Sequence, residues 1–351
     1  MRIHNGIRSG ICICSLLVVL TLGGCGLGGG EDNLGNAYTH MNLAEYDQAL
    51  EALDMAEAAG EDKAEVFRVR GIAKIYSGDY DGAITDLYSA LSYSGTIVDS
   101  KDIDINYYIA DAFERKGDIS SAIDIYTAIL DMRDKDTLSY YKRGADYLEL
   151  DIHDAAVSDF ETCLKLEPEN YDLRIRIAGT LSDKGYEDEG TALLQQFLEE
   201  KERRLSDFDK GRIYFYMKDY ENAKLYFEEA RDDEEEKIIY LGKTYELLGD
   251  YNYAASTYQN YISKHQDSAA VYNQLGLCKI SSGDYAGALQ AFEQGLTVDS
   301  GDCARTLEFN RIVALEYSGD FDRAAKLTND YINKYPTDDK LAKEKEFLAS
   351  R

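Results

Sequence analysis

Helix-breaking residues are almost missing from this sequence. Its 351 residues include only two prolines, Pro168 and Pro336, and no tryptophan. Proline interrupts helices and central strands, so its scarcity leaves room for many uninterrupted helices. Ala, Leu, Glu, Asp, Lys and Tyr dominate the composition instead. The composition therefore predicts an all-α protein.

Positive charge is also scarce. Lys and Arg total 38 against 66 Asp and Glu, which gives a net charge of −28. Such a surface repels nucleic acid and anionic lipid, and it favours solubility. A nucleic-acid-binding protein would show clustered basic residues, and the sequence has no cluster of useful size. We therefore expect no nucleic-acid partner.

Motifs for catalysis or metal binding are lacking. The sequence shows no phosphate-binding loop, nucleophile elbow or Rossmann glycine pattern. Its four histidines, His4, His40, His153 and His265, are scattered and lack the spacing of a metal site. The acidic run RDDEEEK at 231–237 could form a cation site or a solvated face. Its place between two repeat units favours the solvated face. The sequence predicts no enzyme activity, no cofactor and no metal site.

Long hydrophobic runs are missing except near the N-terminus. Residues 11–22, ICICSLLVVLTL, form an apolar run of twelve, which is too short to span a bilayer stably. The run follows Arg2 and Arg8, an order typical of a secretory signal peptide. It ends in Leu22-Gly23-Gly24-Cys25, which resembles the bacterial lipobox.

The lipobox resemblance implies a lipoprotein. It implies cleavage before Cys25, removal of residues 1–24 and modification of Cys25 with diacylglycerol and palmitate. Two or three acyl chains would anchor the protein at the extracytoplasmic side of a cell membrane. Residues 25–33 would then form the lipidated cysteine and a flexible tether. The alternatives are an ordinary signal peptide, or an N-terminal anchor helix with an incidental cysteine.

The rest of the chain uses few cysteines. Cys163, Cys278 and Cys303 remain in the expected mature chain besides Cys25. Their odd number and irregular spacing predict no disulfide framework. We expect them to be small buried side chains.

What the sequence has in abundance is a repeat. The stretch GDYAGALQAF at 283–292 returns as GDYDGAITDL at 78–87, GDYNYAASTY at 249–258 and GDFDRAAKLT at 319–328. The position after Gly-Asp marks each unit, and the markers follow one another at intervals of 31 to 39 residues, most often 34. The markers are Tyr46, Tyr80, Ile119, His153, Glu187, Tyr220, Tyr251, Tyr285 and Phe321. A period of this length indicates a repeated helical hairpin.

Each unit carries the same pattern of small and large residues. A small residue nine positions before the marker predicts a close contact between the two helices of a hairpin, and an alanine three positions after it predicts another. Four positions after the alanine, a large side chain closes the core. The Gly-Asp pair predicts a tight turn, with Gly at positive φ and Asp capping the next helix. The small residues are Gly71, Ala110, Gly144, Ala178, Gly211, Gly242 and Gly276, and the closing residues include Tyr126, Phe160, Phe227, Tyr258 and Phe292.

This pattern resembles the tetratricopeptide repeat. The resemblance covers about residues 34–338 and implies a right-handed α-solenoid of nine helix-turn-helix units. It is closest in the fourth unit, where Tyr141, Gly144, Tyr147, Ala156, Phe160 and Pro168 fall on family positions. The fifth unit departs from it, because Glu187 stands at the marker and Gly190 at the alanine position. Residues 339–351 predict a polar C-terminal capping helix.

The resemblance also implies a binding groove. Members of this family bind extended peptides or partner helices in a concave groove lined by the first helix of each unit. Aromatic side chains with an occasional base suit a peptide that carries apolar side chains and a few acids. Phe215 and Tyr216 are adjacent and form the predicted hot spot, although any such side chain could instead pack against the neighbouring unit. The predicted groove residues are Tyr76, Tyr107, Tyr141, Phe208, Arg212, Phe215, Tyr216, Lys243 and Asn273.

Two functions of different kinds follow from these observations. The first is a membrane-anchored extracytoplasmic scaffold that binds a protein or peptide partner of the cell envelope in its groove. The alternative is a solute- or glycan-binding lipoprotein associated with uptake. The absence of tryptophan argues against a sugar site built on stacked indole rings. The scaffold is therefore the primary hypothesis.

Overall fold

The computed structural model describes residues 32–43, 45–95, 99–201, 203–231, 234–298 and 303–335. These residues form eighteen helices and no strand, which confirms the predicted all-α fold. The predicted signal peptide (1–24), most of the tether including Cys25, and the predicted capping helix (339–351) lie outside the described residues. No helix within the described ranges is long and apolar enough to cross a membrane.

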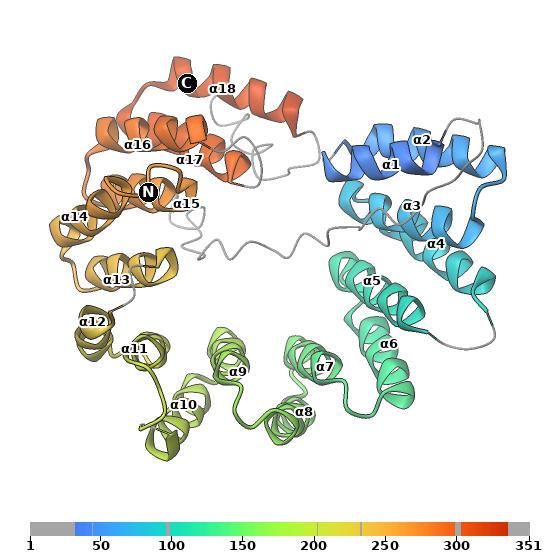
Figure 1. The fold of residues 1–351 in the computed structure, drawn as a ribbon, viewed down its shortest axis with the longest axis horizontal. Coiled ribbons are helices and arrows are strands. Elements are labelled where there is room, and N and C mark those ends of the chain that lie inside the picture. The colour runs from blue at the N-terminus through green and yellow to red at the C-terminus, as the bar shows by residue number, and fades with distance from the viewer. Residues whose placement is uncertain are drawn as a thin grey trace. The chain divides into compact units, whose positions relative to one another are not determined.

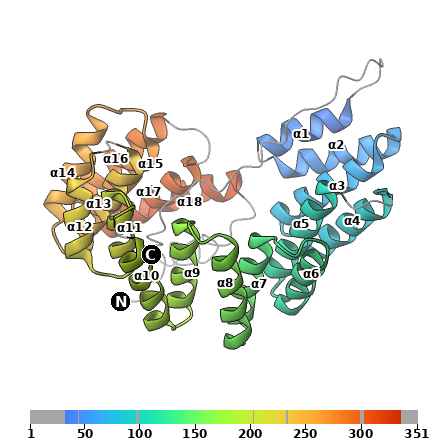
Figure 2. The same ribbon diagram turned by 60° about the horizontal axis from the view of Figure 1, so that its bottom comes forward.

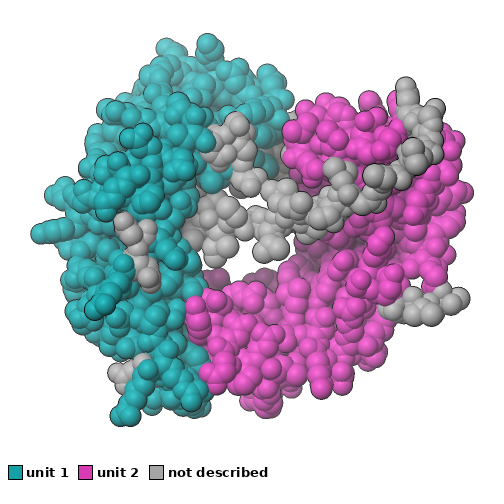
Figure 3. Space-filling model, viewed as in Figure 1, with its two compact units in different colours: residues 1–17, 191–351 teal, residues 18–190 magenta. Residues whose placement is uncertain are grey.

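The chain divides into two compact units, which Figure 3 shows in different colours. We call the described residues 32–190 the N-terminal unit and the described residues from 191 to 335 the C-terminal unit. The boundary falls inside helix α10 (Glu187–Lys201), between Gly190 and Thr191.

Helices alternate regularly along both units. The N-terminal unit contains α1 (Asn33–Asn42), α2 (Tyr46–Ala59), α3 (Lys63–Ser77), α4 (Tyr80–Tyr93), α5 (Ser100–Lys116), α6 (Ile119–Met132), α7 (Thr137–Glu149), α8 (His153–Leu166) and α9 (Tyr171–Asp183). After α10, the C-terminal unit contains α11 (Asp207–Tyr216), α12 (Tyr220–Glu229), α13 (Glu235–Leu247), α14 (Tyr251–Ile262), α15 (Ala269–Ser281), α16 (Tyr285–Val298), α17 (Ala304–Ser318) and α18 (Phe321–Lys334).

Successive helices pair into antiparallel hairpins, and successive hairpins stack. In the N-terminal unit α3 packs on α4, and α4 packs on α5 of the next hairpin. Figure 2 shows α5 to α9 following one another in chain order. Within each unit the odd-numbered helices contact the next odd-numbered helix, α5 and α7 through the Tyr107 and Ser139 side chains, and they lie along one face of the unit (Figure 1). We call this surface the odd-helix face.

The hairpin turns have the predicted geometry. All nine marker residues are the first residues of even-numbered helices. The residue two positions before the marker has a positive φ wherever it is described, from 58° at Asp151 to 88° at Gly185. Glycine adopts this conformation without steric cost, which explains why the repeat prefers it. The aspartate before the marker accepts a hydrogen bond from a backbone N–H of the first helical turn at Asp79, Asp118, Asp219, Asp284 and Asp320.

The hairpin interior depends on a close approach of its two helices. The alanines after the marker are fully buried in both units, as at Ala83 and Ala223. A Cβ atom on Gly276 would lie 2.2 Å from Phe292, and one on Gly242 would lie 2.2 Å from Tyr258. The closing ring therefore occupies the space that a side chain at the small position would need.

The fifth and ninth repeats keep this close packing of their two helices although their residues differ from the pattern. In the fifth unit, a Cβ atom on Gly190 would lie 2.6 Å from the carbonyl oxygen of Ala178. The helices approach too closely there for alanine, which explains the departure at Gly190. In the ninth unit the sizes are exchanged, because buried Ile312 takes the small position and buried Thr328 the closing position. Exchanges that conserve volume are the ones that a packed core tolerates.

Candidate functional site

The predicted groove residues lie on odd-numbered helices, and four of them meet in the C-terminal unit. Phe208, Arg212, Phe215 and Tyr216 belong to α11 and surround Tyr240 of α13. Helical spacing explains the grouping, because residues three, four, seven and eight positions apart share one side of a helix. We call these five residues the Tyr240 cluster.

Ring contacts hold the Tyr240 cluster together. The Phe215 ring meets Tyr240 edge to face, with centroids 5.2 Å apart, and Phe208 does so at 6.1 Å. The Tyr216 and Tyr240 hydroxyl oxygens are 3.1 Å apart. Tyr240 is fully buried, and burial raises the pKa of its phenol. Phe208, Phe215 and Tyr216 are half-buried, so they form a supported aromatic surface.

Arg212 adds a cation to this surface. Its guanidinium carbon lies 5.7 Å from the centroid of Phe208 and 5.6 Å from that of Tyr240. Its Nε atom is 4.0 Å from a carboxylate oxygen of Glu236, whose side chain is about half exposed. The two rings hold the guanidinium in place by cation–π contacts. The cluster thus presents aromatic edges beside a positioned positive charge.

The sequence reasoning missed Tyr240, the centre of this cluster. Tyr240 stands two positions before the small residue Gly242, a position that was not assigned to the groove. No local pattern distinguishes it from the other 28 tyrosines. Its role follows only from the packing of α13 against α11.

Two predicted groove residues of the C-terminal unit are buried instead. Asn273 is 5 % exposed, and its carbonyl oxygen accepts a hydrogen bond of 2.8 Å from the Asn310 amide of α17. Lys243 is 7 % exposed. The expectation that these two side chains lie open in the groove is corrected, because the next odd-numbered helix fixes Asn273 and burial removes most of the surface of Lys243.

The N-terminal unit exposes one predicted aromatic residue fully enough to touch a partner. Tyr76 of α3 is 47 % exposed and stacks on Tyr46, with centroids 5.3 Å apart. The Arg115 guanidinium of α5 lies 5.9 Å from the Tyr76 ring, and its Nε donates to Asp111 at 2.8 Å. We call Tyr46, Tyr76 and Arg115 the Tyr76 stack.

The other two predicted aromatics of this unit connect hairpins. The Tyr107 hydroxyl donates to the Asp136 carboxylate that caps α7, and its oxygen lies 2.7 Å from the Ser139 hydroxyl. The Tyr141 hydroxyl oxygen lies 3.0 Å from that of Thr180 in α9. Both side chains are half-buried, and their hydroxyl groups link neighbouring hairpins.

Reactive groups are few in the described structure. No group of three or more His, Cys, Asp or Glu residues in the described ranges could hold a metal ion. Cys163 and Cys278 are buried free thiols, and burial raises the pKa of each to about 12. Cys303 is only partly buried, so the expectation of three buried cysteines holds for two of them. The His153 ring packs against Tyr186 in a tilted arrangement, with centroids 4.3 Å apart.

Comparison with known proteins identifies the repeat. Two family models described as tetratricopeptide repeat match the chain, one at residues 69–137 and 241–302 and the other at 208–230. Within these stretches the chain carries tetratricopeptide repeats. The matched stretches include parts of both units and α11 from residue 208 on, which carries most of the Tyr240 cluster. Repeats of this kind generally serve as scaffolds for protein–protein interaction.

Solved structures similar to the chain include other helical-repeat proteins. A tetratricopeptide repeat protein from Parabacteroides merdae is 16% identical, with a TM-score of 0.43, and the alignment covers 72% of this chain and 99% of that one. Yeast Tom70 is 13% identical with a TM-score of 0.47, covering 86% and 77%. MamA is 20% identical with a TM-score of 0.39, covering 48% and 95%. No curated protein matches the chain.

Proposed function

We propose that this protein is a membrane-anchored extracytoplasmic scaffold that binds an extended segment of a partner protein along its odd-helix face. The observation that carries the proposal is the Tyr240 cluster. Phe208, Phe215 and Tyr216 are half-buried and pack around buried Tyr240. Rigid aromatic side chains lose little entropy on binding and bury a large area, as interface anchors do.

The charge of the odd-helix face indicates the chemistry of the partner. Arg212 in the C-terminal unit and Arg115 in the N-terminal unit each lie beside an aromatic ring on the odd-helix face of their own unit, in a chain with a net charge of −28. A partner segment with apolar side chains and one or two carboxylates would match both features. An acidic group of the partner would approach the guanidinium of the unit that it binds, where Arg115 also donates to Asp111, while the rest of the surface would repel other acidic segments.

A matched pair of tyrosine variants tests where the partner binds. Tyr76 and Tyr88 are 47 % and 46 % exposed in the same unit, but Tyr76 lies on odd-numbered α3 and Tyr88 on even-numbered α4. The partner is first captured with the full-length protein from its own membrane. Tyr76→Ala and Tyr216→Ala should then each weaken its binding by more than about 1 kcal/mol, whereas Tyr88→Ala should not.

Circular dichroism of the same variants separates binding from folding. Equal loss with Tyr76→Ala and Tyr88→Ala would place the binding surface elsewhere. Lost helical content in Tyr216→Ala would show that the Tyr216 side chain serves folding, and Tyr216→Phe then separates the ring contacts from the hydroxyl contact with Tyr240.

The membrane anchor is supported by the sequence around Cys25. An apolar run of twelve residues precedes Leu22-Gly23-Gly24-Cys25 and follows Arg2 and Arg8. Cys25→Ser should move the protein from the membrane fraction to the soluble fraction, because the thiol that carries the lipid is removed. A variant that stays in the membrane pellet would refute lipidation, and Cys303→Ser is the control.

A further inference from the structure

One repeated place between hairpins is filled in some units and open in another. Three positions form it. Two belong to one hairpin, namely the residue just before the small residue and the residue just before the closing residue. The third belongs to the preceding hairpin and comes just after its closing residue. We call this place the inter-hairpin site. Its three contributors come from an odd-numbered helix and the even-numbered helices on either side.

Arginine fills the inter-hairpin site twice in the N-terminal unit. In the second unit Arg70 donates to both carboxylate oxygens of Asp86, at 3.0 and 3.1 Å, and to Asp54 at 3.1 Å. In the fourth unit Arg143 donates twice to Asp159, both at 2.8 Å. Its third bond, 3.0 Å long, goes to the hydroxyl oxygen of Thr127 in the preceding hairpin.

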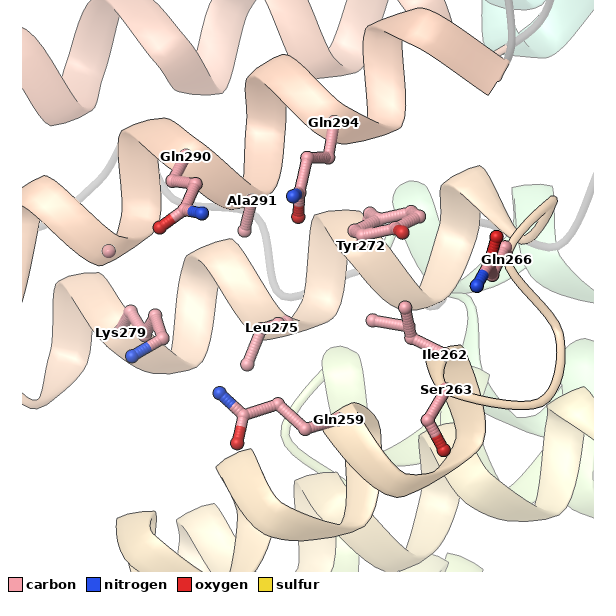
Figure 4. A pocket seen from close by; sticks show the side chains of 11 residues that line it. Gln259, Ile262, Ser263, Gln266, Tyr272, Leu275, Lys279, Gln290, Ala291 and Gln294 are labelled. Carbon is pink, nitrogen blue, oxygen red and sulfur yellow. The ribbon is translucent and has the colours of Figure 1, made fainter.

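The eighth repeat, which belongs to the C-terminal unit, leaves the same site open. Leu275 stands before Gly276 and Ala291 before Phe292, so short apolar side chains replace the arginine and the aspartate. A pocket of about 330 Å³ results, with both residues on its lining. Figure 4 shows the Leu275 side chain between Gln259 of α14 and the glutamines of α16.

Side-chain amides surround this pocket. Gln259 of α14 and Gln290 and Gln294 of α16 approach it from opposite sides, and Gln266 lies near its end (Figure 4). Among the described residues, none of these four amides makes a hydrogen bond to another side chain or to the backbone. Each amide can donate two hydrogen bonds and accept two.

The pocket is also electrically neutral. No carboxylate is among its lining residues, although the chain has 66 Asp and Glu residues. Its single charged lining residue, Lys279, donates a hydrogen bond of 2.6 Å to Asp284, which neutralises its charge. A carboxylate or phosphate ligand would find no unpaired cation there, and a metal ion would find no anionic ligand.

We propose that this pocket binds a neutral polyhydroxylated ligand, one or two rings of a saccharide. Sugar hydroxyls both donate and accept hydrogen bonds, and so do the amides of Gln259, Gln290 and Gln294. The apolar surface of Leu275, Ile262 and Ala291 would meet the C–H face of a sugar ring. The volume is at the lower end of the range for small-ligand sites, about 300–1,000 Å³.

The experiment is a titration of the full-length protein, labelled with ¹⁵N in the glutamine side chains, with maltose and with cellobiose. The amide signals of Gln259, Gln290 and Gln294 should shift and saturate, and each is assigned from its Gln→Ala variant. Gln195 and Gln196 of α10 are the internal controls, because their amides already donate to Glu199 and Glu200. Their signals should stay in place.

Two kinds of variant test the site itself. Gln290→Ala together with Gln294→Ala alters only exposed side chains, and it should weaken saccharide binding about 10-fold, as expected for the loss of two hydrogen-bonding groups. Leu275→Arg together with Ala291→Asp would rebuild the filled site of the second and fourth units and should abolish binding. Gln195→Ala together with Gln196→Ala should leave affinity unchanged.

Several outcomes would overturn the proposal. These are the absence of saturable shifts with both disaccharides, stronger shifts with glucose 6-phosphate, or stronger shifts with N-acetyl-trialanine amide, which would indicate an anion or a peptide site. Unchanged affinity in the Gln290→Ala, Gln294→Ala protein would do the same. Partner binding on the odd-helix face is measured separately and does not depend on the result.

Discussion

The two units build the same hairpin but differ at some of the joints between hairpins. Inside the hairpins, small residues, alanines and closing side chains pack alike in both units, as at Gly144 with Phe160 and Gly276 with Phe292. Between hairpins, the N-terminal unit uses Arg70 and Arg143 with buried aspartates. In the C-terminal unit, the position of these arginines is held by Lys210 in the sixth repeat, where the ammonium group lies over the Tyr226 ring, and by Leu275 in the eighth repeat.

The difference shows which contacts the repeat leaves free to vary. The hairpin interior has no spare volume, so its residue sizes are fixed. The inter-hairpin site borders solvent and accepts an ion pair, a cation over a ring, or an open pocket. Binding properties specific to one unit can therefore develop there without disturbing the fold.

A buried hydrogen bond between a tyrosine and a glutamate appears in both units. The Tyr126 hydroxyl donates to Glu114 at 2.6 Å, and the Tyr258 hydroxyl donates to Glu246 at 2.9 Å. The glutamate stands five positions before the marker in both cases. The units closed by Phe160, Phe227 and Phe292 carry Leu148, Phe215 and Ile280 at that position, so a buried hydroxyl and its acceptor occur together.

The largest effect is expected from breaking an ion pair of the N-terminal unit. Asp159→Ala would leave Arg143, whose side chain is 17% exposed, with the Thr127 hydroxyl as its remaining hydrogen-bond partner at the site. The free energy of unfolding should fall by about 3 kcal/mol, near the lower end for an unpaired buried charge. Urea unfolding followed by circular dichroism measures this, with Glu161→Ala as the surface control. Equal small losses in both variants would show that the pair is not structural.

The hairpin interior should respond alike in both units. Ala223→Leu would overpack the contact of α12 with α11 and lower the free energy of unfolding by about 1–3 kcal/mol. Ala83→Leu in the N-terminal unit should cost a similar amount, because both alanines are fully buried. Thermal unfolding of the two variants compares them. An unchanged melting curve for either would contradict the shared interior.

Buried carboxyl groups should make the N-terminal unit more sensitive to pH. Burial, with a further contribution from Glu114, raises the pKa of Asp146 to about 7, and its Oδ2 atom has no hydrogen-bond partner among the described residues. The folded state therefore holds a proton that the unfolded state releases near pH 4. This stabilisation is complete at low pH and is lost as the pH rises through about 7.

Asp146→Asn tests this pH dependence. Between pH 5 and pH 8, the wild-type protein should lose about 2 kcal/mol more unfolding free energy than the variant. Glu246→Gln in the C-terminal unit should show a smaller difference, because burial raises the pKa of Glu246 only to about 6. Urea unfolding at the two pH values measures both. A larger effect in Glu246→Gln would reverse the comparison.

The smallest change in the free energy of unfolding is expected when an inter-hairpin site of the N-terminal unit is converted to the apolar form found in the C-terminal unit. Arg143→Leu together with Asp159→Ala gives the fourth unit the Leu and Ala of the eighth. Replacing both partners of a buried pair should change the unfolding free energy by less than about 1 kcal/mol. Comparison with Asp159→Ala alone isolates the unpaired charge. A double variant as unstable as the single one would show that Arg143 is needed for its packing.

The sequence determined the hairpins almost completely. Gly78 and Asp79 can be read as a turn and a cap because positive φ and capping depend on the residue itself and its nearest neighbours. The marker positions gave the start of every even-numbered helix, and the alanine positions gave its buried side. The same register placed Phe208, Arg212, Phe215 and Tyr216 on one helix as a candidate site.

Tertiary structure alone decided what meets between hairpins. No local sequence pattern predicts three of these contacts. They are Tyr240 at the centre of the cluster, the hydrogen bond between Asn273 and Asn310 across 37 residues, and the pocket beside Leu275. Each depends on side chains from separate helices reaching the same point, and most of their positions do not affect hairpin packing. A periodic sequence records the contacts that recur in every unit, because only those are constrained by the same geometry each time.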